Sequence, residues 1–399
     1  MNFNEMSETL TVMSEYSYLI HLLRCAIHGE IPRELPEELS FEKVYQYAMD
    51  HDVANLAFYA VERLHNRPDA ELYAQWGRRR DLALMRDMNQ EFARHEILTE
   101  FDSRGIPFKE LQGTILKRLY PRPEYRTMSD LDFIVEKTRL EECSAILENL
   151  GYNCSWRGRD EVNGIRRPGI FVELHTHYFS KESDYYGTME LTFGRKAFAE
   201  TAASTELYLY SILHAAKHYF AGGCGIRRVL DMYYLDANYG DVIDRNHVNA
   251  VLEKAGVERF AQEFSDLARA WFGTGDGSAG VTAMEQYILG SGLHGKRENF
   301  ISSKLRRIEK GSSYSFGAKI RYLFTRLFPG DQTMLRHYPV LRKCRILYPF
   351  CWFHRIIRML LGKNRDMAVA DLKLVLRTKG DSRDIMTEPG SDEATTDKK

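Results

Sequence analysis

The stretch SDLDFIV, residues 129–135, decides the fold class of this chain. Side chains alternate between the two faces of a β-strand, so Asp130 and Asp132 would share one face and the apolar residues would face a core. Two carboxylates held this close repel each other, and one of them must take up a proton or recruit a cation. Mg²⁺ suits such a pair, because it binds one or two carboxylates together with substrate phosphates. The pattern also fits two solvated aspartates at a strand edge, so the surrounding sequence is needed to distinguish the two interpretations.

The residues around this stretch alternate between strand and helix patterns. In chain order we expect a strand-like piece 106–113, a helix 114–119, the strand 131–135, a helix 140–150, a strand 152–157, a polar loop 159–168 and a strand 170–176. This order predicts a compact α+β unit that carries the two aspartates.

Helical patterns flank this unit on both sides. Before it we expect helices over 14–28, 41–64 and 69–103, and after it over 204–220, 227–239 and 246–272, followed by a glycine-rich linker 273–280. The predicted regions are an N-terminal helical region 1–104, a core 105–200, a helical region 201–300, a basic helical region 301–379 and a disordered tail 380–399.

The composition is that of an ordinary globular protein. The chain has 399 residues, of which 44% are hydrophobic and 28% charged, which excludes a disordered or collagen-like chain. No run of 18 apolar residues occurs, so we expect no transmembrane helix. The first residues lack the pattern of a signal peptide, and none of the six cysteines form a C-x-x-C pair. These features indicate a reducing compartment and a cytoplasmic location.

The charge is distributed unevenly along the chain. Residues 301–379 contain 18 Lys and Arg against 4 Asp and Glu, while the rest contains 37 against 52. A basic segment of this kind is expected to face an anion. Four anions are open: nucleic acid, a membrane surface, a phosphorylated substrate or the acidic part of the same chain. Aliphatic neighbours accompany its aromatic residues, so we predict that it docks on the catalytic unit without strong general affinity for RNA or DNA. Peripheral membrane contact through residues 346–361 stays open.

Two further motifs support the metal interpretation of the aspartates. Gly113 and Thr114 follow the first strand-like piece and would open a helix, whose free backbone N–H groups attract anions. Glu173 and His175 share one face of the strand 170–176. A third carboxylate on a neighbouring strand would complete a two-metal site, in which the ions lie ~3.5–4 Å apart.

Several motifs in a fixed order resemble a known family. They are Leu111-Gln112-Gly113-Thr114, Leu119-Tyr120-Pro121, Arg126, the stretch 129–135, Leu150-Gly151-Tyr152 and Val172-Glu173-Leu174-His175. Together they resemble the uncharacterised bacterial nucleotidyltransferase family, within the DNA polymerase β-like nucleotidyltransferase superfamily. Weaker likeness continues through His214, Lys217-His218, the segment 225–228 and Asp231 to the pieces 338–341 and 352–355, so it covers at most about residues 14–361.

The resemblance implies a polymerase-β-like core that carries out nucleotidyl transfer. Such an enzyme moves a nucleoside monophosphate from an NTP to an acceptor, and ATP is the expected donor. Asp130, Asp132 and Glu173 would hold Mg²⁺ or Mn²⁺, and Glu173 would also help to activate the acceptor. The acceptor is open: a small molecule, a sugar, a lipid head group, a protein or tRNA.

The resemblance also implies a triphosphate site beside the metals. Gly113 would let the triphosphate approach the backbone, Thr114 would donate to it, and Arg126 would reach its oxygens. This chain departs from the family in having Gln112 where the motif has lysine, with Lys109 three residues earlier, and Thr114 where serine or glycine is usual.

Two other functions compete with this hypothesis. A glycosyltransferase that uses D-x-D for its metal would need a nucleotide-binding α/β layer before the motif, where this chain is predicted to be helical. A non-catalytic nucleotide-binding or scaffold protein would keep the fold, and the departures at Gln112 and Thr114 favour it while the three carboxylates oppose it.

The remaining polar motifs have two interpretations each. His214 and His218 lie one helical turn apart, and without a third ligand we expect a structural role or a place in a pocket wall. Arg227 and Arg228 would either meet phosphate or pair with acidic residues of the chain. For His175 we expect a supporting hydrogen bond.

Overall fold

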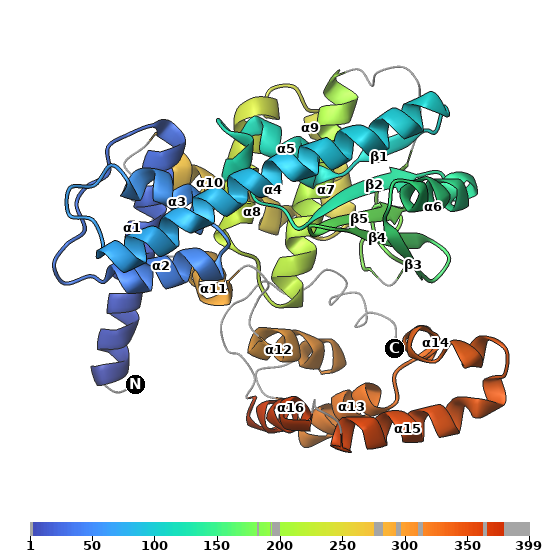
Figure 1. The fold of residues 1–399 in the computed structure, drawn as a ribbon. Coiled ribbons are helices and arrows are strands. Elements are labelled where there is room, and N and C mark those ends of the chain that lie inside the picture. The colour runs from blue at the N-terminus through green and yellow to red at the C-terminus, as the bar shows by residue number, and fades with distance from the viewer. Residues whose placement is uncertain are drawn as a thin grey trace.

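The computed structural model describes residues 3–181, 183–191, 193, 200–274, 282–292, 297–309, 314–361 and 365–378. The predicted tail 380–399 and residues 275–280 of the predicted linker lie outside these ranges. The fold is a mixed α+β fold, as predicted (Figure 1).

A five-stranded mixed sheet forms the centre of the molecule, in the order β1-β2-β5-β4-β3. Its strands are β1 (Phe108–Glu110), β2 (Asp130–Val135), β3 (Asn153–Arg157), β4 (Glu161–Arg166) and β5 (Ile170–His175). Strands β2 and β5 are parallel, and the other pairs are antiparallel. The parallel pair matters most for function, because it places Asp132 directly beside Glu173.

One face of the sheet is apolar and covered by two helices. Leu131 and Phe133 of β2 pack with the second half of α4 (Ala70–Ser103) and with α6 (Leu140–Asn149). The opposite face carries Asp130 and Asp132, as the alternation of the sequence predicts. The hydrophobic pattern therefore fixes which face of the sheet bears the carboxylates.

The structure corrects one prediction in this unit. Residues 159–168 were predicted as a polar loop, but they contain β4, which pairs with β3 and β5. Strand β4 lacks the usual alternation of apolar and polar residues. Its residues Glu161 and Asn163 face the site and not a core: Glu161 lines a cavity, and Asn163 donates a hydrogen bond to Glu173.

Helices before and after the sheet share one apolar core. The N-terminal helices are α1 (Phe3–His28), α2 (Phe41–Asp50), α3 (Ala54–Val61) and α4; the later ones are α7 (Glu200–Ala221), α8 (Ile226–Tyr239), α9 (Arg245–Lys254), α10 (Glu258–Phe272) and α11 (Ala283–Ser291). Residues from both groups form a single cluster of buried side chains. Helix α4 runs from this helical body to the sheet (Figure 1).

Two predicted helices are broken where the backbone turns. The predicted helix 41–64 ends at α2 and resumes as α3, because Asp52 between them has φ 53°. The predicted helix 246–272 is divided into α9 and α10 at Gly256, which has φ 66°. Such left-handed conformations end a right-handed helix.

Short 3₁₀ helices connect several of these elements. They are η1 (Lys117–Leu119), which follows α5 (Gln112–Leu116), then η2 (Pro123–Tyr125), η3 (Lys137–Arg139), η4 (Pro339–Arg342) and η5 (Arg345–Leu347). Segment η2 and the residues after it lead directly into β2.

The basic C-terminal region is helical with small cores. Its helices are α12 (Arg297–Ile308), α13 (Phe316–Leu327), α14 (Asp331–His337), α15 (Tyr348–Leu361) and α16 (Arg365–Arg377). One buried cluster joins α12, α13 and α16, and another joins α14, η4 and α15. Within the described residues, no helix is both long and apolar enough to cross a membrane. The six cysteines are free thiols.

Candidate functional site

The parallel strands β2 and β5 bring three potential metal ligands together. Asp132 and Glu173 are neighbours in the register, and His175 lies one pleat further along β5. The Nε2 atom of His175 is 3.5 Å from Asp132 Oδ1 and 3.6 Å from Glu173 Oε2. The ligand atoms of the three residues lie within 4.8 Å of one another, which is close enough to hold one ion.

The carboxylates of this cluster are only partly neutralised by the protein: besides His175, Arg157 Nη1 lies 4.0 Å from Glu173 Oε1. Burial, followed by the negative charge of Asp132, raises the pKa of Asp130, whose Oδ1 accepts a hydrogen bond from Ser129 Oγ at 2.9 Å. Burial and the same neighbour raise the pKa of Glu173, although Asn163 Nδ2 donates to its Oε1 at 2.9 Å. A divalent cation between these groups would relieve the repulsion, so the donor set fits a hard metal ion.

His175 responds to the same charges in the opposite direction. Burial by itself would lower the pKa of His175, but the hydrogen bond with Asp132 and the charges of Asp132, Glu161 and Glu173 outweigh it and raise the pKa. The imidazole therefore supports the carboxylates by a hydrogen bond, in line with the role expected from its place on the strand.

The acidic cluster forms one wall of a cavity of about 1210 Å³. Gly113, Arg126, Asp130, Asp132 and Glu173 line it, so five of the six residues predicted for the site come together. Helices α7 and α8 and the loop after β5 close other sides, and Leu335 and Arg345 of the basic region reach the wall.

Thr114, the sixth predicted residue, lies outside this wall. Its side chain is buried, and its Oγ1 donates to the backbone carbonyl of Leu111 at 3.1 Å. The threonine hydroxyl thus bonds to the residue that precedes α5, and its predicted contact with a triphosphate stays a prediction.

Arg126 is buried and held by a carboxylate. Its Nε and Nη2 donate to the two oxygens of Asp231 at 2.6 and 2.9 Å, and Tyr120 also donates to Asp231. Its Nη1 lies 3.4 Å from the carbonyl oxygen of Gly113. Arg126 therefore fixes the Gly113 turn to α8, and its predicted contact with phosphate stays a prediction.

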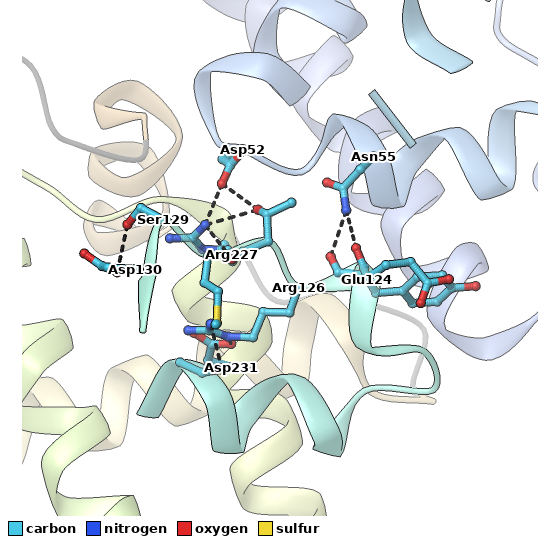
Figure 2. A network of polar contacts seen from close by, with 12 residues as sticks. Asp52, Asn55, Glu124, Arg126, Ser129, Asp130, Arg227 and Asp231 are labelled. Atoms are coloured by element: carbon cyan, nitrogen blue, oxygen red, sulfur yellow. Dashed lines mark hydrogen bonds and ion pairs between the residues drawn. The ribbon is translucent and has the colours of Figure 1, made fainter. Parts of the chain in front are cut away.

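A second polar network holds the loop before β2 in place. Arg227 Nη1 donates to Asp52 Oδ2 at 2.5 Å and to the Thr127 carbonyl at 2.9 Å. Asn55 Nδ2 donates to the carbonyls of Glu124 and Tyr125 at 2.8 and 3.2 Å (Figure 2). The N-terminal helices thus position the residues that lead into Asp130, a role that sequence reasoning missed.

Two other cations of the cavity wall have no carboxylate partner. No carboxylate oxygen of the described residues lies within ion-pair distance of Arg228 or Lys217, and Arg228 Nε is buried without a hydrogen-bond partner. Burial, with the nearby charge of Arg227, lowers the pKa of Arg228 to about 10. Burial and Arg228 likewise lower the pKa of Lys217. A bound anion would relieve this repulsion.

His214 connects these cations to the Gly113 turn. Its Nδ1 lies 2.7 Å from Gln112 Nε2 and 3.1 Å from Arg228 Nη1, and its Nε2 lies 3.2 Å from His218 Nε2. Burial and the charge of Arg228 lower the pKa of His214 well below its usual value, so Nδ1 of a neutral imidazole accepts both bonds. The histidine pair thus serves as a pocket wall, one of the two roles expected for it.

The departure at Gln112 also gains a structural explanation. Gln112 takes part in the hydrogen bond with His214, where a lysine would add a further positive charge next to Arg228. Lys109 does not substitute for it, because its ammonium group pairs with Glu206 and bonds Tyr178.

A half-buried acidic cluster and cations without carboxylate partners line one cavity, an arrangement that fits a metal ion together with phosphates. The family described as "Uncharacterised nucleotidyltransferase" matches residues 37–273, which is more than half of the chain, so the chain belongs to this family. No curated protein and no solved structure matches it.

The matched range contains the acidic cluster on β2 and β5 and the cations on α7 and α8, but not the basic region. Leu335, Arg345 and the predicted likeness at 338–341 and 352–355 lie outside it. The glycosyltransferase alternative is set aside, because the residues described before Asp130 form helices and only one short strand, β1.

Proposed function

We propose that the chain transfers a nucleoside monophosphate from an NTP, with ATP as donor, to a hydroxyl or similar acceptor. One observation carries this proposal: carboxylates with raised pKa values and cations without carboxylate partners line the same cavity. A metal-bound triphosphate complements both sets of residues, because its metal ion is positive and its phosphates are negative. In the reaction, the acceptor oxygen bonds to the α-phosphorus, the bond to the β-phosphate oxygen breaks, and pyrophosphate leaves.

Asp130, Asp132 and Glu173 would hold Mg²⁺ or Mn²⁺ in this proposal. The carboxylate oxygens suit either ion. When bound, the ions supply positive charge to the phosphoryl oxygens and make the acceptor hydroxyl more acidic. Glu173, whose pKa is raised, would help to take the proton of the acceptor.

The triphosphate would lie between the Gly113 turn and α8. A Cβ at Gly113 would contact Met128 Sδ at 3.4 Å, an ordinary van der Waals distance, so the protein itself does not require glycine there. The missing side chain instead leaves the backbone open to the cavity. Arg228 and Lys217 would neutralise the phosphates, while Arg126 and Thr114 would hold the turn in shape.

The acceptor would enter from another side of the cavity. Trp156 and Arg159 near the β3–β4 hairpin, and Leu335 and Arg345 of the basic region, line the wall away from α8. We place the reaction in the cytoplasm, since NTPs are abundant there and the six cysteines are free thiols.

A non-catalytic nucleotide-binding protein is the second candidate. It is favoured by Gln112, which bonds His214 where the family motif has lysine, and by Arg126, whose charge is neutralised by Asp231. Such a protein would bind the NTP and transfer nothing.

The test is to incubate the purified chain with each α-labelled NTP, Mg²⁺ or Mn²⁺ and a cell lysate. Label that becomes attached to an acceptor with the wild type, but not with Asp132→Asn, is the expected result. Saturable NTP binding without transfer would instead support the second candidate, and the absence of both would contradict nucleotide chemistry altogether.

A further inference from the structure

Helix α15 and Ile346 of η5, which precedes it, present an apolar stripe to solvent. Ile346, Phe350, Phe353 and Ile357 are 82%, 71%, 65% and 38% exposed. The spacing of three and four residues places Phe350, Phe353 and Ile357 on one side of α15, and Ile346 lies four residues before Phe350 in η5. The other side of α15 buries Cys351 against Met334 and Leu341, so the exposed stripe is not needed for the local core.

The chain around this stripe is basic and free of acidic residues. From Gln332 to Arg365 the sequence contains eight Lys and Arg and no Asp or Glu. Lys343, Arg345 and Arg358 are exposed beside the stripe, and the one described acidic partner is Asp331, whose carboxylate lies 3.4 Å from Arg345 Nη2. The surface therefore combines exposed apolar side chains with positive charge that the protein leaves largely unmatched.

Helix α13 adds a second stripe of the same kind. Phe316, Ile320 and Phe324 recur every four residues and are all exposed. Arg355 Nη1 of α15 lies 3.4 Å from the carbonyl of Arg326, so α13 and α15 are neighbours. Together with α16 they form the lower layer of the molecule in Figure 1.

We propose that the α15 face, defined as the exposed stripe of α15 with Lys343, Arg345 and Arg358, binds the surface of an anionic lipid bilayer. The apolar side chains would enter the boundary between headgroups and acyl chains, and the cations would meet lipid phosphates. The contact is peripheral, because no described helix is long and apolar enough to span a membrane. The α13 stripe would extend the same surface.

A bilayer fits this face better than nucleic acid does. Nucleic acids are bound by cations and by aromatic rings that stack on bases. Ile346 and Ile357 have no ring, and exposed aliphatic side chains gain nothing from a polyanion in water. A helix that lies in a membrane interface, in contrast, typically combines aliphatic, aromatic and basic residues in this way.

The proposal goes beyond nucleotidyl transfer and does not depend on it. Arg345 lines the cavity, and Ile346 beside it is the most exposed apolar residue of the stripe. A bilayer on the α15 face would therefore lie next to one wall of the cavity.

The test is co-sedimentation of the full chain with vesicles. Vesicles of phosphatidylcholine mixed with phosphatidylglycerol should bind the protein, with an affinity that falls as salt is raised, while vesicles of phosphatidylcholine alone should bind it at least about tenfold more weakly. The double variant Phe350→Asp and Phe353→Asp should lose binding to the mixed vesicles by about tenfold or more.

A matched control is available on α4. Met88 and Phe92 are both 65% exposed, also one helical turn apart, but lie outside the basic region. Met88→Asp with Phe92→Asp should bind the mixed vesicles like the wild type, and all variants should keep the wild-type melting temperature because the replaced side chains are exposed.

Three outcomes would overturn the proposal. The first is no binding to the mixed vesicles, or equal binding by the α15 variant. The second is salt-sensitive, sub-micromolar binding of random RNA that the α15 variant loses. The third is a concentration-dependent dimer of the wild type that the same variant abolishes, which would assign the face to a second copy of the chain.

Discussion

The two walls of the cavity differ in how the protein treats their charges. On the sheet wall, the imidazole of His175 lies 3.5 Å from Asp132 and 3.6 Å from Glu173, Arg157 lies 4.0 Å from Glu173, and Asp130 has no ion pair among the described residues. On the helical wall, the charges fall into two sets: Arg126 and Arg227 pair with Asp231 and Asp52, whereas Arg228 and Lys217 have no carboxylate partner among the described residues.

This difference distinguishes residues that stabilise the fold from residues that are available to bind a ligand. A partly buried charge without a partner, such as that of Arg228, costs free energy, and a ligand that supplies the opposite charge offsets this cost; Lys217 is exposed. On the sheet wall the carboxylates outnumber their cationic partners His175 and Arg157, and on the helical wall Arg228 has no carboxylate partner among the described residues. Arg126 and Arg227, which are paired, would then hold the fold, whereas the sheet carboxylates would bind a metal ion and Arg228 would bind phosphate.

The sheet wall should give the largest effect on activity. Asp132→Asn removes a central charge of the metal cluster, and we expect transfer to fall by about 10³-fold or more, since metal binding supplies several kcal/mol to such reactions. The measurement is the rate of label transfer. Asp160→Asn is the matched control: Asp160 lines the same cavity but pairs with Lys137 and Lys181, so its variant should stay within about tenfold of wild type.

The paired set should give the largest effect on stability. Asp231→Asn leaves Arg126 buried without its partner and should cost about 3 kcal/mol in urea unfolding at neutral pH. Asp52→Asn should cost less than about 1 kcal/mol, because the Asp52 side chain is 40% exposed. If both variants lost the same free energy of unfolding, the distinction between the buried Arg126–Asp231 pair and the half-exposed Arg227–Asp52 pair would be wrong.

The pH dependence of the Asp231 effect has a definite sign. Burial would raise the pKa of Asp231, but Arg126 outweighs it and lowers the pKa. The ionised group therefore stabilises the fold above its unfolded pKa, and this stability is lost as the pH falls through the folded value. The difference between wild type and Asp231→Asn should narrow below about pH 4.

Arg228 should affect binding of the nucleotide and not the fold. Arg228→Met removes a cation that we assign to the phosphates, and it should raise the KM for the NTP by about 10–100-fold, the loss of ~1.5–3 kcal/mol expected for one charged hydrogen bond. Its melting temperature without ligand should change little, because the variant loses the hydrogen bond to His214 but also the repulsion between Arg228 and Arg227. Arg122→Met, at an exposed residue outside the cavity wall, serves as control and should leave KM unchanged.

The smallest effect is expected from Asp130 in the absence of metal. Burial and Asp132 raise the pKa of Asp130, so its charged form destabilises the metal-free fold at neutral pH. Asp130→Asn should therefore raise the melting temperature at pH 7 by about 2 °C. The gain should shrink as the pH falls through the raised pKa of folded Asp130, because the wild-type group then takes up a proton. A lower melting temperature at pH 7 would mean that the charge is already compensated.

Strong local periodicity made the sheet wall predictable. The strands expected at 131–135 and 170–176 are observed as β2 and β5, and alternation alone places their carboxylates away from the core. Strand β4 was missed because it carries Glu161 and Asn163 toward the site, where a polar residue replaces the usual apolar one.

The helical wall could not be predicted in the same way. The Arg126–Asp231 pair joins residues 105 positions apart, and the Arg227–Asp52 pair joins residues 175 positions apart. No periodicity encodes which of several arginines meets a carboxylate, since this depends on tertiary packing. The sequence alone therefore assigned phosphate to Arg126 and left Arg228 undecided.

The most direct test of the central claim is calorimetric titration with a non-hydrolysable ATP analogue, with and without Mg²⁺. We predict that the wild type binds it in a Mg²⁺-dependent manner, that Asp132→Asn loses the Mg²⁺-dependent part, and that Arg228→Met loses about tenfold or more in affinity with or without the ion. Wild-type affinity in both variants, or no binding of any NTP analogue by the wild type, would contradict the assignment of the two walls to one nucleotide.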